Sequence, residues 1–346
     1  SLEDAHGYNT AIGHSALPVL NAGADGHNVA LGYYSGFATT TGVNNTFLGA
    51  AAGGFCTTGH YNTFVGKNAG LGITGTKLTG DGNTAVGKDS GLLLQGAATA
   101  NVLIGALAGD ALTTGSSNVA VGYGALTTDD VGQHNVAIGR DALSAQNIAS
   151  AANTYNIGVG SGAGFSNVTG TANTIVGFQA GYGSSGNSNS SNCFFGYSSG
   201  VNTTTATSNT FMGTQSGQAI TTGSNNLFLG NDSGRTGSPG GNYTTQSNEI
   251  VLGDENITES HIQVDWTVAS DERDKTDFTA LDLGLDFVKA LAPVTYKWDK
   301  RSKYIDKTQD DWADTDLDTI THDGTHKEDW LDVGFKAQDV ETLEKA

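Results

Sequence analysis

The sequence predicts a mainly β protein, a repetitive parallel β-solenoid or β-roll followed by a small α+β domain. A motif of the form Asn-x-x-apolar-Gly recurs every 17–21 residues through most of the chain. Residues 1–269 hold 47 of the 50 glycines, whereas residues 270–346 carry 31 of the 51 Asp, Glu, Lys and Arg residues. One composition does not describe both parts. We therefore expect a solenoid over 1–253, a junction over 254–269 and a second domain over 270–346.

Thirteen regular copies of the motif define the solenoid. A glycine follows each repeated asparagine after four residues, and a degenerate last copy runs from Asn248 to Gly253. The apolar stretches, such as 46–48, suit very short strands, and the Thr-Thr-Gly clusters between them are turn signals. One unit cannot bury an apolar face alone, but stacked units can, so we expect about fourteen stacked coils. The repeated asparagines are Asn9, Asn28, Asn45, Asn62, Asn83, Asn101, Asn118, Asn135, Asn156, Asn173, Asn192, Asn209 and Asn226.

The side chains of the repeat have predictable roles. We expect the repeated Asn to bond backbone groups in a turn and the repeated Gly to adopt positive φ or a close backbone approach. The two cysteines, Cys56 and Cys193, are too few for a disulfide framework and suit small buried hydrophobes. A coil of about 17 residues encloses little volume, so association of several chains is expected to bury the remaining face. The phenylalanines expected to point inward are Phe47, Phe64, Phe194, Phe195, Phe211 and Phe228.

Residues 254–346 predict both strands and helices. Alternating apolar residues predict a strand that closes the solenoid, and helical spacing follows until Pro293. Two further strands flank an acidic loop at 299–330, and a helix begins at Gln338. The residues that carry these periodicities are Ile262, Val264, Trp266 and Val268 (strand), Leu281, Leu285, Val288 and Leu291 (helix), Val294, Tyr296 and Trp298 (strand), Val333, Phe335 and Ala337 (strand), and Val340 and Leu343 (helix).

Composition excludes several classes of function. The net charge is −19 and basic residues are not clustered, which argues against nucleic acid as a partner. A run of about 18 apolar residues is absent, so no helix inserted in a membrane is expected. The acidic run 310–318 does not fit a calcium loop, because Thr319 and Thr325 stand where Gly and Glu are needed. His322 and His326 lack the context of a zinc site, so we expect neither a metal nor a cofactor.

The repeat resembles the head repeats of trimeric autotransporter adhesins and, more closely, those of bacteriophage tail fibres. The C-terminal part resembles the intramolecular chaperone domain of tail fibres, tailspikes and endosialidases. Three motifs carry this second resemblance: Ser-Asp-Glu-Arg-x-Lys at 270–275, Leu-Ala-Pro-Val-x-Tyr-x-Trp at 291–298 and Gly-Phe-x-Ala-Gln-Asp-Val at 334–340. The resemblance implies a homotrimer whose C-terminal domain directs assembly. The sequence also departs from this family, because the long helices that usually end the domain are missing from it.

The same resemblance implies that the domain cuts itself off at the Ala269–Ser270 bond. Ser270 is then the nucleophile and Lys275 the base, with Asp271 in support, at most for a single turnover. A Ser-Lys pair is an attested variant of the catalytic triad, provided that the lysine is neutral. Five residues of separation do not place both side chains on one face of a helix or strand. Either a turn or a lysine from another protomer must bring them together.

We therefore expect a fibre segment on the extracellular face of a phage-like virion, bound to other tail proteins and to a glycan or protein receptor of the host. The alternatives are a cellular trimeric surface adhesin and, last, a glycan-degrading tailspike, for which the solenoid shows no paired carboxylates. Exposed aromatics next to the motif glycine suit either contact with a receptor or packing between chains. These aromatics are Tyr33, Tyr34, Tyr123, Phe178, Tyr182 and Tyr197.

Overall fold

The computed structural model divides the chain into two compact units, residues 1–257 and 258–346. In the first unit and the residues just after it, the structure describes residues 7–22, 25–150, 152–184 and 186–261. In the rest of the second unit it describes residues 287, 290–299, 304, 320–327, 329 and 331–344. Each unit is described by itself below.

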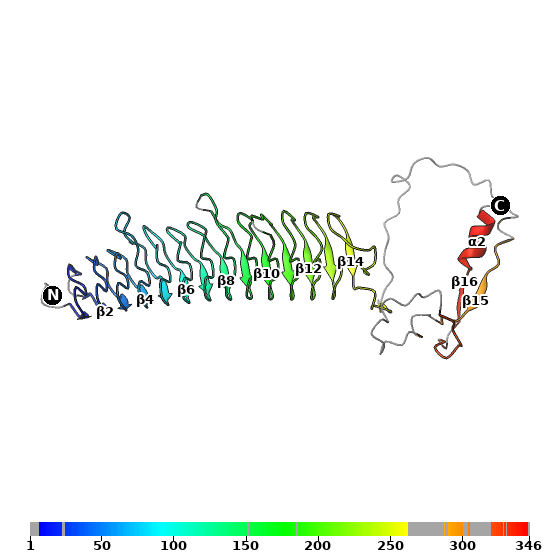
Figure 1. Cartoon of the computed structure of the whole chain (residues 1–346), viewed down its shortest axis with the longest axis horizontal. Coiled ribbons are helices and arrows are strands. Elements are labelled where there is room, and N and C mark those ends of the chain that lie inside the picture. The colour runs from blue at the N-terminus through cyan, green and yellow to red at the C-terminus, as the bar shows by residue number, and fades with distance from the viewer. Residues whose placement is uncertain are drawn as a thin grey trace. The chain divides into compact units, whose positions relative to one another are not determined.

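The first unit is a parallel β-solenoid, as the repeat predicts (Figure 1). Fourteen strands of three residues form one sheet in chain order, and each pairs in parallel with the next at a constant register. We call the stretch from one strand to the next a coil. The strands are β1 Thr10–Ile12, β2 Val29–Leu31, β3 Thr46–Leu48, β4 Thr63–Val65, β5 Thr84–Val86, β6 Val102–Ile104, β7 Val119–Val121, β8 Val136–Ile138, β9 Ile157–Val159, β10 Thr174–Val176, β11 Cys193–Phe195, β12 Thr210–Met212, β13 Leu227–Leu229 and β14 Ile250–Leu252.

The glycine that follows each strand makes a corner at which successive coils touch. Gly66 has a φ of +133°, and an added Cβ would lie 2.5 Å from the carbonyl oxygen of Gly87 in the next coil. Both the backbone conformation and the close approach therefore require glycine. The additional residues of the longer coils lie in the turns and leave the strand register intact. For example, β4 pairs in register with β5, although Thr84 follows Thr63 by 21 residues.

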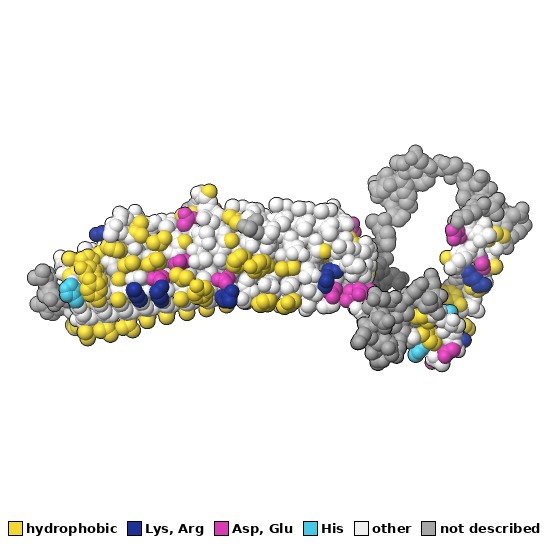
Figure 2. Space-filling model, in the orientation of Figure 1, with side chains coloured by type: hydrophobic (Ala, Val, Ile, Leu, Met, Phe, Trp, Pro, Cys, Tyr) yellow, Lys and Arg dark blue, Asp and Glu magenta, His cyan; other side chains and the backbone are white. Residues whose placement is uncertain are grey.

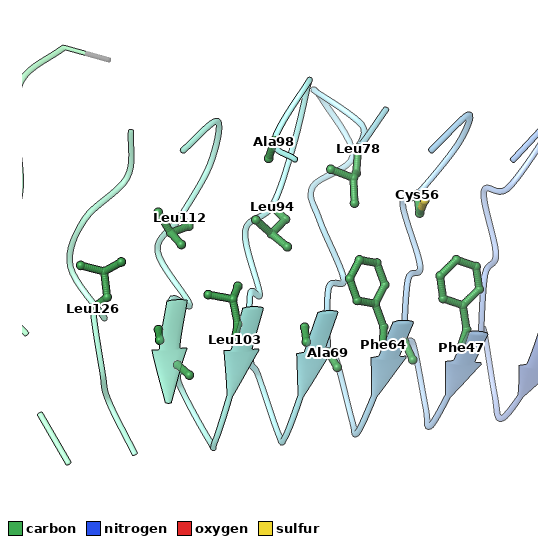
Figure 3. Close-up of a cluster of buried hydrophobic side chains, with 14 of the residues drawn as sticks. Phe47, Cys56, Phe64, Ala69, Leu78, Leu94, Ala98, Leu103, Leu112 and Leu126 are labelled. Carbon is green, nitrogen blue, oxygen red and sulfur yellow. The ribbon is translucent and has the colours of Figure 1, made fainter. Parts of the chain in front are cut away.

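The core runs through the middle of the coils, because the second residue of each three-residue strand points inward. Phe47 and Phe64 are fully buried and stack with ring centroids 5.7 Å apart, pointing the same way in successive coils (Figure 3). Burial raises the pKa of the Cys56 thiol to about 12, so this cysteine is a small apolar core residue, as expected. The expectation for Phe195 was wrong. It is the third residue of β11, points outward and is 52% exposed, whereas Phe194 fills the core.

A ladder of buried asparagines links the coils. The Nδ2 of Asn45 donates to Oδ1 of Asn28 (3.1 Å) in the preceding coil and to the carbonyl oxygen of Gly59 (2.9 Å), and its Oδ1 accepts from the backbone N–H of Asn62 (2.9 Å). The structural role expected for this residue is confirmed, and it extends from the turn to the neighbouring coils. The ladder ends at Glu249, whose backbone N–H donates to Asn226. Glu249, rather than Asn248, therefore holds the repeat position in the last coil.

The second unit contains a two-stranded antiparallel sheet, β15 (Val294–Tyr296) with β16 (Asp332–Gly334), and the helix α2 (Ala337–Glu344). Trp298 lies beyond β15, and Ala337 begins α2 rather than continuing β16, so both predicted strands end early. Phe287 and Ala290 are helical, as predicted. The predicted closing strand at 262–268, the rest of the predicted helix and the acidic run 310–318 lie outside the described residues. Among the residues that the structure describes, no helix has the length and apolar character needed to span a membrane.

Candidate assembly surface and self-cleavage site

The residues predicted to carry out self-cleavage are not placed by the structure. Ser270, Asp271, Lys275 and the Ala269–Ser270 bond all lie outside the described residues. Their arrangement therefore stays a prediction.

The outward face of the solenoid sheet is uncharged along its whole length, and its third-position residues are all apolar. The first and third residues of each strand point away from the core, and none of these 28 residues is charged. Figure 2 shows hydrophobic side chains running along one edge of the solenoid and gathering in further clusters on the face toward the viewer. The third-position residues are all apolar: Ile12, Leu31, Leu48, Val65, Val86, Ile104, Val121, Ile138, Val159, Val176, Phe195, Met212, Leu229 and Leu252. None of them is buried in the single chain.

The size of this sheet face matters for its role. Fourteen strands spaced by about 4.8 Å, each three residues of about 3.3 Å long, give a face of roughly 600 Å². Exposed apolar patches beyond a few hundred Å² mark interaction surfaces on soluble proteins. A specific interface buries about 800 Å² on each partner, so the sheet face with its flanks suffices for one. The sequence predicted that chains associate but not through which face. The signal was the apolar residue before every motif glycine.

The second unit also exposes apolar side chains. Among its described residues none is buried, and Val333, Phe335 and Trp298 are 76%, 53% and 48% exposed. A groove of about 260 Å³ lies between residues 290–292 and the segment that leads into α2, and its lining includes Leu291 and Leu343. So much exposed apolar surface costs free energy in water, which favours partners that cover it.

Tyr304 organises the described part of the loop between β15 and β16. Its hydroxyl donates to Oδ1 of Asp299 (2.8 Å) and accepts from the backbone N–H groups of Gly324 (3.0 Å) and His326 (3.3 Å). The rings of His322 and His326 both lie against the Tyr304 ring. Within the described residues no group of three or more His, Cys, Asp or Glu side chains is placed to hold a metal ion.

The aromatics predicted to flank the motif glycine do lie on the solenoid surface. Tyr33, Tyr123, Phe178 and Tyr197 are about half exposed. Several stack from coil to coil: Phe178 on Tyr197 with centroids 5.6 Å apart, and Tyr182 on Phe165 with centroids 4.7 Å apart. Such stacks present flat apolar surfaces to solvent.

Comparison with known proteins identifies the second unit. Residues 270–344 match the family model described as chaperone of endosialidase. No curated protein and no solved structure matched the chain. The match begins at the serine of the first motif and includes β15, β16 and α2. A parallel β-solenoid thus precedes a C-terminal domain of the chaperone-of-endosialidase family, an architecture that fits a phage protein of the tail-fibre or tailspike type.

Proposed function

We propose that the chain is a homotrimeric segment of a tail fibre on a phage-like virion, where it binds a receptor on the host surface. The observation that carries the proposal is the uncharged sheet face that runs through all fourteen strands. In a trimer this face lies against the partner chains. The opposite flanks of each coil then face solvent and are free to contact a receptor and other tail proteins.

The C-terminal unit supports assembly in this proposal. Its described residues form no buried core in a single chain, so its apolar side chains need partner copies to leave water. Parallel solenoids also need their registers aligned, because a slip by one coil leaves apolar strands uncovered at both ends. A domain that trimerises first would fix that register. Three is the number of chains that the resemblance to trimeric adhesin heads and tail fibres implies.

The sheet face is tested by one charge substitution and a matched control in the same coil. Ile104 is the third residue of β6, and Thr114 is exposed on a turn of that coil. Ile104→Asp would bury a charge in the proposed interface, whereas Thr114→Asp would not. Sedimentation velocity should show trimers for the wild type and Thr114→Asp and dissociated chains for Ile104→Asp. Intact trimers of Ile104→Asp would contradict the assignment of this face.

We also propose self-cleavage between Ala269 and Ser270. Oγ of Ser270 attacks the carbonyl carbon of Ala269 and gives up its proton to neutral Lys275. Lys275 then passes this proton to the departing nitrogen, so the peptide bond is replaced by an ester and a free amine on Ser270. Water then hydrolyses the ester and restores the hydroxyl. Asp271 supports the lysine, which comes from the same chain or from another protomer.

A denaturing gel tests this chemistry. Wild-type protein should yield two fragments, one of which begins at Ser270 by N-terminal sequencing. Ser270→Ala should remain one band, and Lys275→Ala should slow cleavage at least tenfold. Ser260→Ala, at an exposed serine ten residues earlier, is the matched control and should cleave normally. Identical band patterns for wild type and Ser270→Ala would refute the Ser-Lys mechanism.

A further inference from the structure

A pocket opens on the flank of the solenoid, beside the apolar sheet face. It has a volume of about 330 Å³ and spans the coils that carry β8, β9 and β10. Gly162 lies at its floor: an added Cβ there would lie 3.2 Å from the ring of Tyr182. This volume falls at the lower end of the range of about 300–1,000 Å³ for small-molecule sites.

The pocket exists because one coil lacks bulk at a position that its neighbours fill. Gly162 is the second residue after its motif glycine, and the equivalent residues in the adjacent coils are Asp141 and Gln179. Gly124 holds the same position two coils before Gly162, but there the carboxylate of Asp141 occupies the space, 2.7 Å from an added Cβ. The space above Gly162 is less filled: the nearest atoms, on the Tyr182 ring and Cγ of Gln179, lie 3.2 and 3.7 Å from an added Cβ.

The walls combine flat apolar surfaces with paired hydrogen-bonding groups. Phe178 forms one wall, and the stacked rings of Phe165 and Tyr182, 3° apart in orientation, form another. At one end, Nε of Arg140 donates to Oδ2 of Asp141 at 2.8 Å. Because this bond uses a single donor of the guanidinium, its terminal NH₂ groups remain available to a ligand.

Gln179 and Ser161 add an amide and a hydroxyl to the same lining. The pocket thus offers donors and acceptors side by side, next to aromatic faces. A pyranose has matching chemistry: C–H groups on one face pack on an aromatic ring, and adjacent hydroxyls both donate and accept. A simple acyl chain lacks the donors and acceptors that would pair with these groups.

The net negative charge of the solenoid favours neutral sugars over acidic ones. The Arg140–Asp141 pair is neutral as a unit, and the solenoid carries 15 acidic against 5 basic residues up to position 269. An acidic polysaccharide would meet a surface of its own sign. We propose that this pocket binds one neutral hexopyranose unit of a surface polysaccharide. The inference rests on the proposed role in receptor binding and names its ligand class and contact residues.

The test uses the full-length trimer with methyl glycosides of glucose, galactose, mannose and N-acetylglucosamine, and with glucuronic acid as the acidic probe. Saturation-transfer difference NMR should show contact with at least one neutral glycoside and none with glucuronic acid. Gly162→Gln fills the pocket with the residue that Gln179 and Gln215 supply at this position, where both have positive φ (53° and 55°). It should fold and remain trimeric, but weaken binding at least tenfold.

Tyr61→Ala is the control, because it removes an exposed aromatic that does not line the pocket. It should bind as the wild type does. Absence of contact with every neutral glycoside, or equal binding by Gly162→Gln, would overturn the pocket assignment. Sedimentation of the same samples separates this failure from failure of the trimer, because a trimer that binds no sugar refutes only the pocket.

Discussion

Gly53 and Phe47 share one space in the solenoid core: an added Cβ at Gly53 would lie 2.5 Å from Cδ1 of the Phe47 ring. Gly53 follows Phe47 by six residues in the same coil. In the coils at β7 and β8 the central strand residue is alanine, Ala120 or Ala137, and the residue six positions later is a fully buried leucine, Leu126 or Leu143. In the coils at β2 and β5 the central alanine is followed six positions later by Gly36 or Gly91, and leucines from other positions, Leu17 or Leu94, fill the space there. In the coils at β3, β7 and β8 the two positions thus exchange volume, which keeps these coils filled.

This exchange predicts a strong coupling between the two positions. Phe47→Ala alone should destabilise by about 3–5 kcal/mol through the cavity that it leaves. Gly53→Leu alone should also destabilise, because the new side chain collides with the ring. The double variant should lose clearly less stability than the two single variants lose together, since it recreates the Ala–Leu combination of the coil at β7. Thermal unfolding of the four proteins measures this, and strictly additive shifts would argue against shared volume.

The asparagine ladder predicts a contrast between two adjacent residues. Asn45→Ala removes the acceptor of the Asn62 N–H, which is left buried without a partner, and the donor to Gly59, whose carbonyl oxygen keeps only the long contact from the Cys56 thiol at 3.9 Å. Each such loss costs about 1–3 kcal/mol. Asn44 is exposed, and Ala100 and Ala172 adopt positive φ at its position in other coils. Asn44→Ala should therefore change the melting temperature little, and a similar loss in both variants would contradict the ladder.

The glycine corner predicts a similar contrast. Gly66→Ala should destabilise by about 2 kcal/mol or more, because positive φ is strained for alanine and its Cβ meets the next coil. Gly75→Ala is the control, as nothing lies within 4 Å of an added Cβ there. Differential scanning calorimetry compares the two. Equal melting temperatures would show that the coils can separate to admit a methyl group.

Asp129 predicts a pH dependence of stability. Burial raises the pKa of its carboxyl, although Gly132 N–H and the Gln146 amide donate to it. The folded state therefore binds this proton more tightly than the unfolded state, and the residue's contribution to stability falls as pH rises from the ordinary value of 3.8 through the raised pKa. Asp129→Asn removes this dependence.

Melting temperatures of both proteins between pH 4 and 8 test this sign. The melting temperature of Asp129→Asn minus that of the wild type should become more positive as pH rises, whatever the size of this difference at pH 4. Asn167, which donates to Gly170 at the equivalent turn two coils later, is a natural precedent for the amide. A difference that stays constant with pH would show that Asp129 does not titrate in this window.

The strands and the core of the solenoid could be predicted because one short motif repeats. The motif did not distinguish Phe194 from Phe195, since both neighbours are large and apolar. Counting back from Gly196 resolves them, because the residue before the motif glycine points outward in every coil. Glu249 was missed because Asn248 matches the motif by letter, whereas the ladder requires only a backbone N–H at the last coil.

The second unit was harder to predict in detail. Alternation at Val333 and Phe335 correctly suggests a strand, but Ala337 is a strong helix former and starts α2 instead. None of its described residues is buried, so the apolar pattern of this part is not explained by a core among the residues that the structure describes. Ser270 and Lys275 are predicted from the motif alone, and they lie outside the residues that the structure describes.

Multi-angle light scattering of the purified wild-type protein tests the central claim most directly. The claim is that three chains join through the outward face of the fourteen-stranded sheet. We predict a single species whose mass is three times that of the polypeptide seen on a denaturing gel, which is 35.4 kDa for the uncleaved chain. A stable monomer at micromolar concentration, with the sheet face exposed to water, would contradict the account.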